Sequence, residues 1–182
     1  MVRNTYFQSI EAFKDKQVIK VLTGIRRCGK SMLMEQFMQS LLERGVSERQ
    51  ITYIRLDDLD NELLLEYHNL YAFIKSALLE DRMNYVFIDE VQLCKDFQKP
   101  VETLFNYKNV DLYLTGSNAD LLSGELATLL SGRYVTIDML PFSFCEYLEC
   151  IKENNFPAQT TEENYYDYVK FGSMPFTVQL KK

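Results

Sequence analysis

The sequence predicts an α/β domain, a three-layer sandwich with a mostly parallel five-stranded sheet and helices on both faces. Two observations indicate this fold class. Short apolar runs alternate with stretches in which apolar residues recur every three or four positions, as on one face of a helix. A basic loop with two glycines follows the first apolar run directly, where a strand of a parallel sheet would pass into a helix. With 47% hydrophobic residues among 182, the chain can bury the core of one such domain.

The predicted strands are short apolar runs, and the predicted helices lie between them. The strands span 18–23, 51–56, 85–89, 110–115 and 134–139. The helices span 30–44, 62–80, 97–107, 119–130 with a break near Ser123, 141–152 and 162–169. Gly45 would end the first helix, and Pro141 would stand in the first turn of the fifth, where its missing N–H costs nothing.

Helical spacing predicts which residues of the first two helices face the core. Leu33, Phe37 and Leu41 fall at intervals of four on the first helix, so we expect them to be buried. Four residues of the second helix are expected to be buried as well: Leu63, Leu70, Ile74 and Leu78. The single histidine, His68, should lie at the surface or at the boundary of the core.

The most informative pattern lies between the first predicted strand and the first predicted helix. It contains eight residues: Gly24, Ile25, Arg26, Arg27, Cys28, Gly29, Lys30 and Ser31. The two glycines allow the backbone to wrap an anion, Lys30 can reach the β- and γ-phosphates, and the Ser31 hydroxyl can hold a bridging Mg²⁺. The first turn of the helix, which includes Met32, adds its positive N-terminal end. We therefore interpret residues 24–32 as a nucleotide-binding segment rather than an incidental glycine turn.

Two carboxylates, Asp89 and Glu90, end the third predicted strand. A carboxylate at the end of an apolar strand can be a partner of the Mg²⁺ held by Ser31, so we assign Asp89 to the metal. The neighbouring Glu90 can polarise a water molecule for attack on the γ-phosphate. In isolation such a pair could simply be a solvated strand end. In a chain that also has a phosphate loop, we interpret it as catalytic.

Two further polar positions are candidates for the same site. The carboxyl ends of parallel strands meet at one edge of a sheet, so Ser117 and Asn118, after the fourth strand, should lie near the loop. Asn118 could hydrogen-bond the attacking water or the γ-phosphate, or it could cap a helix. Arg133 could neutralise charge on the transferring phosphoryl group as an arginine finger, or it could lie in a solvated turn.

Charge and cysteine content limit the alternatives. A net charge of −6 argues against a general nucleic-acid or anionic-membrane surface. The four cysteines form no CxxC pair, which argues against a structural zinc site and a disulfide framework. Cys28 lies in the loop, where N–H groups could favour its thiolate, although we prefer a packing role. Neither a signal peptide nor an apolar segment of membrane-spanning length is visible, so we expect a cytoplasmic protein without a membrane partner.

In this order, the motifs resemble those of the AAA-type P-loop ATPases of bacteria and archaea that carry a glycine-arginine-arginine phosphate loop. The matching stretches are 21–31, 87–92, 114–119, 130–133 and 140–146. The resemblance implies the P-loop NTPase fold, ATP as the nucleotide and Mg²⁺ as the cofactor. It implies Asp89 on the metal and Glu90 as the catalytic base. It also implies Asn118 as a sensor of nucleotide state and Arg133 as a finger.

The resemblance also bears on domain organisation. It implies an ATPase core over 1–140 and a helical extension over 141–182 that could be a truncated lid. Arg3 and Tyr6 resemble the N-terminal segment that runs near the adenine in this family. Its members typically continue past a motif like residues 171–175 into a winged-helix region and a nuclease-like domain, whereas this chain stops at Lys182.

Two functions remain open at this point. The first is an ATPase that couples hydrolysis to conformational change, for which a homo-oligomer is one arrangement and the protein client is not identified by the sequence. The second is a nucleotide-dependent binding module with little hydrolysis. A small-molecule kinase fits the Asp89 and Glu90 pair least well. A nucleic-acid partner is not supported by the net charge.

Overall fold

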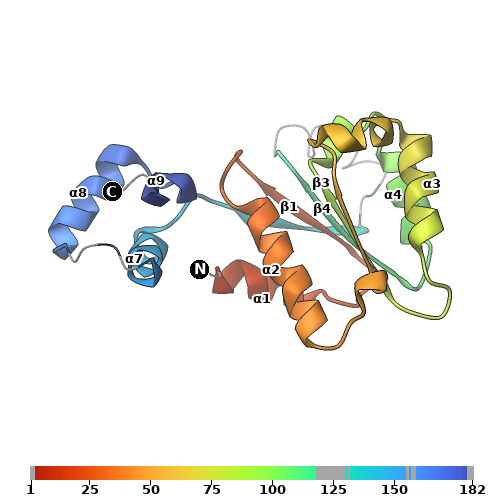
Figure 1. The fold of residues 1–182 in the computed structure, drawn as a ribbon, viewed down its shortest axis with the longest axis horizontal. Helices are drawn as coiled ribbons and strands as arrows, with labels where there is room; N and C mark the ends of the chain where they lie inside the picture. Colours follow the sequence, from red (N-terminus) through yellow and green to blue (C-terminus); the bar gives the residue numbers. More distant parts are fainter. Residues whose placement is uncertain (1–2, 118–129, 131, 155, 157–158, 180–182) are drawn as a thin grey trace.

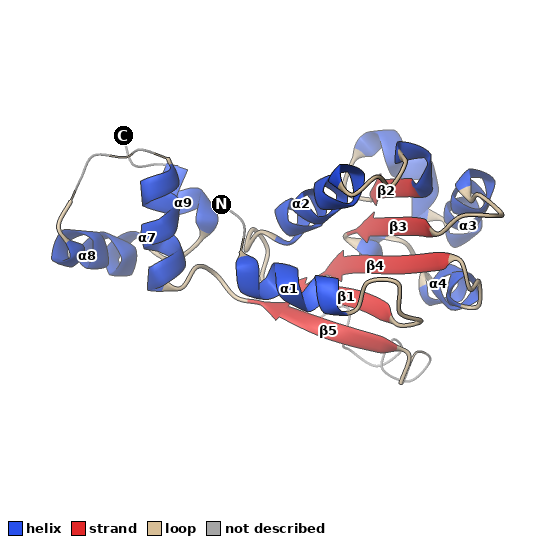
Figure 2. Cartoon of the chain, turned by 90° about the horizontal axis from the view of Figure 1, so that it is seen from below, coloured by secondary structure: helices blue, strands red, loops and turns tan. Residues whose placement is uncertain are grey.

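Five parallel strands form one sheet in the computed structural model, which describes residues 3–117, 130, 132–154, 156 and 159–179. The strands are β1 (Ile19–Gly24), β2 (Ile51–Arg55), β3 (Asn84–Asp89), β4 (Val110–Gly116) and β5 (Tyr134–Met139). Their order is β2-β3-β4-β1-β5, with all four neighbouring pairs parallel (Figure 2). The predicted fold class is therefore confirmed. β1 lies inside the sheet between β4 and β5, so the loop after it stands at the carboxyl edge with a strand on either side.

Helices cover both faces of this sheet. α1 (Asn4–Ala12) and α2 (Lys30–Glu43) lie on one face, and α3 (Tyr67–Ala77) and α4 (Gln98–Phe105) lie on the other (Figure 1). Because side chains alternate along a strand, Val21 of β1 belongs to the core under α3 and α4, whereas Leu22 belongs to the core under α1 and α2. The described residues also contain three 3₁₀ segments: Glu48–Gln50, Leu59–Leu65 and Val91–Leu93.

The residues after β5 form a separate helical lobe (Figures 1 and 2). It consists of α7 (Phe144–Glu153), α8 (Thr161–Phe171) and α9 (Pro175–Gln179). The lobe has its own small core: Phe142, Tyr147, Ile151 and Val178. This arrangement agrees with the predicted helical extension after residue 140. That the extension acts as a lid remains a prediction.

Most predicted elements occur within two residues of their expected ends, and the buried positions of α2 are confirmed. The helix predicted over 62–80 is wrong in its first part. Leu59–Leu65 forms a 3₁₀ turn in which Leu63 is 78% exposed, and α3 begins only at Tyr67. The break occurs because Glu66 is extended and forms a β-bridge with Lys95, which removes it from any helix. Within α3, Leu70 and Ile74 are buried as expected.

Other differences concern the start of α7, the two ends of the chain and the helix predicted over 119–130. Pro141 is not in a first helical turn, because α7 begins at Phe144 after Ser143, whose hydroxyl accepts a hydrogen bond from the Glu146 N–H at 3.3 Å. Glu146 in turn accepts from the Ser143 N–H at 2.8 Å, which completes a capping box. The sequence reading missed α1 and α9. The helix predicted over 119–130, with its break at Ser123, falls almost wholly outside the described residues.

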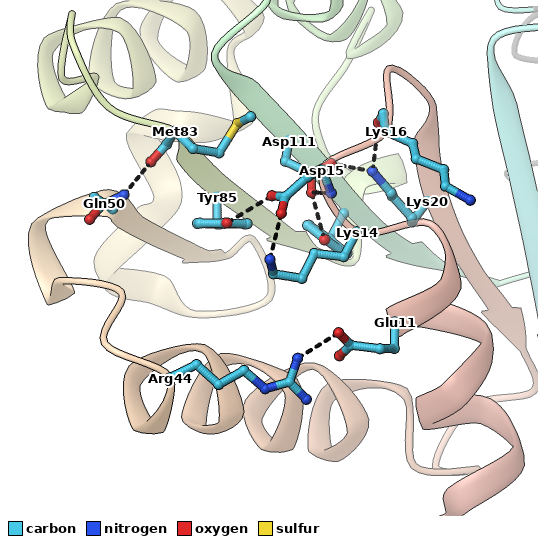
Figure 3. A network of polar contacts seen from close by, with 11 residues as sticks. Glu11, Lys14, Asp15, Lys16, Lys20, Arg44, Gln50, Met83, Tyr85 and Asp111 are labelled. Atoms are coloured by element: carbon cyan, nitrogen blue, oxygen red, sulfur yellow. Dashed lines mark hydrogen bonds and ion pairs between the residues drawn. The ribbon is translucent and has the colours of Figure 1, made fainter.

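A buried network of charged and hydroxyl groups lies at the amino edge of the sheet, opposite the loop after β1 (Figure 3). Lys20 and Asp111, 0% and 2% exposed, form an ion pair between β1 and β4. Asp111 also accepts hydrogen bonds from the Asp15 N–H at 2.9 Å and from the Tyr113 hydroxyl at 2.7 Å. Tyr85 of β3 donates to the Asp15 carboxylate at 2.8 Å. The network thereby ties the turn between α1 and β1 to three strands.

Candidate functional site

The loop from Gly24 to Lys30 follows β1, and its first residue contacts the end of β5. Gly24 has φ +146°, and a Cβ placed there would overlap the Met139 carbonyl oxygen and stand 2.9 Å from the Cys28 sulfur. Only glycine fits both this backbone conformation and this close approach. The loop is thus anchored to the carboxyl edge of the sheet at its first residue.

The loop ends at the start of α2. Gly29 precedes the helix with φ +106°, and no heavy atom lies within 4 Å of the place where its Cβ would be. Lys30 is 5% exposed, and its ammonium donates to the carbonyl oxygens of Gly24 at 3.1 Å and Ile25 at 3.5 Å. A helix N-terminus and an ammonium group therefore meet inside one loop, which is the arrangement expected of a site for phosphate groups.

Asp89, at the end of β3, is held from two sides. The Thr115 hydroxyl of β4 donates to its Oδ1, and the Tyr53 hydroxyl of β2 donates to its Oδ2 at 3.4 Å. Burial is the main cause, and the nearby charge of Asp89 the second, of a raised pKa of Tyr53. Its phenol therefore stays protonated and can donate the hydrogen bond. Asp89 itself is only 2% exposed. Its carboxylate is therefore fixed in place by the two neighbouring strands.

Glu90 follows in a left-handed backbone conformation, with φ 54° and ψ 47°. Its N–H donates to the Thr115 hydroxyl at 3.0 Å, so Thr115 connects the backbone of Glu90 to the side chain of Asp89. The Glu90 carboxylate accepts a hydrogen bond from the Gln92 amide at 2.5 Å. After the sharp turn at Glu90 the two neighbouring carboxylates have different surroundings: Asp89 is buried, whereas Glu90 is half-buried.

Glu90 and Lys30 line one cleft of about 290 Å³ at the carboxyl edge of the sheet. Its lining residues come from the ends of four strands and the turns after them: Arg26, Lys30, Asp57, Glu90, Gln92, Leu93 and Ser117. Three predicted site residues, Arg26, Lys30 and Glu90, thus line the same space, and so does Ser117 after β4. Arg26 and Arg27 are exposed, as are Ile25 and Met32, which are 52% and 57% exposed. The loop therefore holds Lys30 and Cys28 inside while its arginines remain accessible.

The side chains available for a metal ion are the Ser31 hydroxyl and the Asp89 carboxylate, both predicted metal ligands. Both are hard oxygen donors of the type that Mg²⁺ prefers. Across the described parts of the chain, no group of three or more His, Cys, Asp or Glu residues is arranged to hold a metal. A magnesium ion here would accordingly depend on phosphate and water oxygens as well, which is usual for this ion. By the chemistry of their donor atoms the residues present fit such a site, and neither of these two side chains is among the described residues that line the cleft.

Of the four predicted catalytic residues, Lys30 and Glu90 line the cleft, and the other two are not brought to it by what the structure describes. Asn118 lies outside the described residues. Arg133 immediately precedes β5, and its carbonyl accepts from the Ile19 N–H at 2.9 Å at the start of β1. The length of β1, about 17 Å at 3.3 Å per residue, separates it from the loop. Arg133 pairs with Glu102 at 3.1 Å, both side chains being partly exposed. It is therefore excluded from the site of its own chain.

Cys28 has the structural environment of a packing residue. Its side chain is fully buried, and burial raises the pKa of its thiol against the opposing effects of Lys30 and Arg3. The alternative of a thiolate stabilised by the loop is therefore not supported.

The N-terminal segment reaches the loop, through Arg3. Its guanidinium donates to the Cys28 carbonyl at 3.2 Å and to the Leu140 carbonyl at 2.7 Å. It also forms a bidentate pair with Glu146 of α7, at 2.7 and 2.9 Å, and stacks over the Tyr6 ring at 4.4 Å. One buried arginine thus joins the loop, the end of β5 and the helical lobe.

Sequence reasoning missed several residues of this region. Tyr53 was read only as a strand residue, and Thr115 and Gln92 only as parts of the matching stretches. No local signal could have assigned Tyr53 and Thr115 to Asp89, because only the strand order shows that β2 and β4 flank β3. No local signal distinguishes Asp57, which lies in an acidic segment.

Comparison with known proteins agrees with this geometry. Residues 16–148 match the family model described as "AAA domain". The chain belongs to the AAA domain family. Together, family membership and the loop support ATP binding of the AAA type. The match includes β1, the loop, β3 and the start of α7.

Relatives and solved structures extend the comparison. An uncharacterised protein of Haemophilus influenzae is 37% identical over 97% of this chain, and one of Methanocaldococcus jannaschii is 32% identical over 86%. The chain spans 44% and 35% of the lengths of these relatives.

Two solved structures share the fold. AMPPCP-bound DnaA of Aquifex aeolicus has a TM-score of 0.66 at 17% identity, with 98% of this chain and 59% of that one covered. ORC1 of Aeropyrum pernix in complex with DNA has a TM-score of 0.64 at 10% identity, with 98% and 58% covered. At these identities the likeness concerns the fold. Among the described residues, no helix is both long and apolar enough to cross a membrane.

Proposed function

We propose that this domain binds Mg-ATP in the cleft and hydrolyses it to ADP and phosphate, and that hydrolysis is coupled to movement of the helical lobe. One observation carries the proposal: Lys30 of the phosphate loop and Glu90 after β3 line the same cleft. A cation for the β- and γ-phosphates and a carboxylate for a water molecule therefore face a common space.

In this mechanism, the loop amides and the Lys30 ammonium bind the phosphates. Glu90 accepts a hydrogen bond from the attacking water and directs its lone pair toward the γ-phosphorus. Asp89 and Ser31 would offer oxygen ligands to Mg²⁺, which when bound would supply positive charge to the phosphates. Catalysis would thus come from positioning and from charge stabilisation.

The coupling to the lobe would pass through Arg3. Its guanidinium touches the Cys28 carbonyl in the loop and the Glu146 carboxylate on α7. A change in the loop when the nucleotide changes would alter one end of this contact. The two-part contact of Arg3 is thus the physical link proposed between nucleotide state and lobe position.

A second candidate is a nucleotide-dependent binding module that holds ATP and rarely hydrolyses it. The position of Arg133 favours it, because this residue cannot reach the cleft of its own chain. Arg133 can act as a finger only in the site of a neighbouring subunit, so an isolated copy would lack it. In a homo-oligomer, Arg133 of a neighbouring subunit would complete the site for ATP hydrolysis. An isolated chain would act as the binding module.

The test is phosphate release from Mg-ATP over a range of protein concentrations. We expect Lys30→Ala to abolish tight ATP binding, and Glu90→Gln to retain ATP but stop release. Activity per molecule that rises with concentration, and that is lost in Arg133→Ala, would support completion between subunits. Release at the level of Lys30→Ala at every concentration would refute hydrolysis, and retained ATP binding would then support the binding module.

A further inference from the structure

Gln92 is a cleft residue to which none of the roles above is assigned. The 3₁₀ turn Val91–Leu93 follows the left-handed Glu90 and folds the chain back on itself. This turn brings the Gln92 amide to 2.5 Å from the Glu90 carboxylate. Gln92 is half-buried and, like Glu90, lines the cleft. The sharp turn therefore presents both side chains to the same space.

The orientation of the Gln92 amide follows from the chemistry of its partner. An ionised carboxylate only accepts hydrogen bonds, so the NH₂ group of Gln92 must face Glu90. The carbonyl oxygen Oε1 of the same amide is then not used by Glu90. This oxygen is buried, and it has no hydrogen-bond partner among the described residues. A buried acceptor without a donor costs about 1 to 3 kcal/mol, so such an atom in a cleft indicates a missing donor.

We propose that Gln92 is a catalytic residue that holds the attacking water together with Glu90. The water donates one O–H to the Glu90 carboxylate and the other to Gln92 Oε1, which leaves a lone pair free to point at the γ-phosphorus. Its oxygen forms the new bond to phosphorus as the bond from phosphorus to the β–γ bridging oxygen breaks. That electron pair leaves on ADP, and the water proton passes to Glu90. This inference rests on the proposed ATP hydrolysis.

The amide also positions Glu90. The carboxylate of the left-handed, half-buried Glu90 would otherwise sample several rotamers, and the Gln92 N–H selects one of them. Gln92 thus contributes a donor to the base and an acceptor to the nucleophile. The phosphate-binding groups, Lys30 and the loop amides, do not depend on either contact, so nucleotide affinity should be separable from turnover.

The test uses two variants of the full chain and a matched control. Gln92→Met keeps the length of the side chain and removes both polar groups, and Gln92→Glu keeps its shape but removes the donor. Gln39→Met makes the first change at an exposed position of α2, away from the cleft. The measurements are the single-turnover rate of γ-phosphate cleavage and the dissociation constant of a fluorescent ATP analogue.

We expect Gln92→Met to lower the cleavage rate by about tenfold to a hundredfold, which is the usual effect of misplacing a reacting group. The dissociation constant of the ATP analogue should stay within about threefold of the wild-type value. Gln92→Glu should also be slow, because a second carboxylate beside Glu90 replaces the amide donor with a like charge. Gln39→Met should match the wild type in both measurements.

Several outcomes would overturn the inference. A Gln92→Met rate within about threefold of the wild type, with the wild type active, would remove Gln92 from the mechanism and leave the proposed function intact. Equal losses of rate and affinity would indicate a structural role only. If Gln92→Met does not fold, a folded Gln92→Glu variant with a wild-type rate would refute the inference equally. A wild-type rate no higher than that of Lys30→Ala would refute hydrolysis itself, and the role of Gln92 with it.

Discussion

The buried pair of Lys20 and Asp111 makes a sharp prediction about stability. Both side chains are almost fully buried, and Lys20 donates to Asp111 and to the Lys16 carbonyl at 3.0 Å (Figure 3). Burial lowers the pKa of Lys20 and raises the pKa of Asp111, and each partner opposes the effect on the other. Lys20→Met fills similar space but leaves the Asp111 carboxylate with only the Asp15 N–H and the Tyr113 hydroxyl.

The magnitude follows from leaving one buried charge without its partner. Breaking a buried ion pair in this way costs about 3 to 5 kcal/mol. At a urea m-value of about 2 kcal/mol per M, the unfolding midpoint would fall by about 1.5 to 2.5 M. Without the ammonium, the pKa of Asp111 should rise further. Protonation then relieves the buried charge, so the loss of stability should be smaller near pH 5 than near pH 8.

The assay is urea unfolding followed by circular dichroism at both pH values. The control is Lys99→Met, which breaks the exposed pair of Lys99 and Asp96, and it should shift the midpoint little. The double variant Lys20→Met with Asp111→Leu should cost clearly less than the two single changes added together. A Lys20→Met midpoint no lower than that of Lys99→Met, or additive single changes, would refute this account of the network.

Three further predictions concern the loop and the helical lobe. Gly24→Ala should abolish ATP binding and lower the melting temperature, because the added Cβ would overlap the Met139 carbonyl, and wild-type affinity in a titration would contradict this. Burial raises the pKa of Glu146, but the hydrogen bonds from Arg3 and the Ser143 backbone outweigh it, so its net pKa is lowered. The contact between Glu146 and Arg3 therefore stabilises the fold above the unfolded pKa of the carboxyl group, about 4.3. This stabilisation is lost as the pH falls through the pKa of Glu146 in the folded protein. Glu146→Gln should accordingly be less stable than wild type at pH 7, with the difference narrowing below about pH 4 in thermal melts, and a constant difference would disprove it. Exposed Cys145 should react with a thiol reagent well before buried Cys28, as peptide mapping can show, and equal rates would contradict the buried environment of Cys28.

Much of the sheet and the centre of the site were predictable because their signals are local. The strand β1, the two glycines of the loop and Lys30 are consecutive in the chain, and glycine at Gly24 answers a local need for positive φ. Glu90 was found because it directly follows an apolar strand. The break before α3 was not predictable in this way. It depends on a bridge between Glu66 and Lys95, which lie far apart in sequence.

By itself, the sequence determined the five strands in order, the helix after the phosphate loop, the loop itself and the two carboxylates, since each depends on residues close together in the chain. The tertiary structure alone decided which strands are neighbours. That order brings Tyr53 and Thr115 to Asp89, and it sets Arg133 a full strand length from the cleft. It also buries Lys20 against Asp111, 91 residues later in the chain. The physical reason is that strand pairing and desolvation are non-local: the partner of a polar group is chosen by the packed sheet and not by the group's neighbours in sequence.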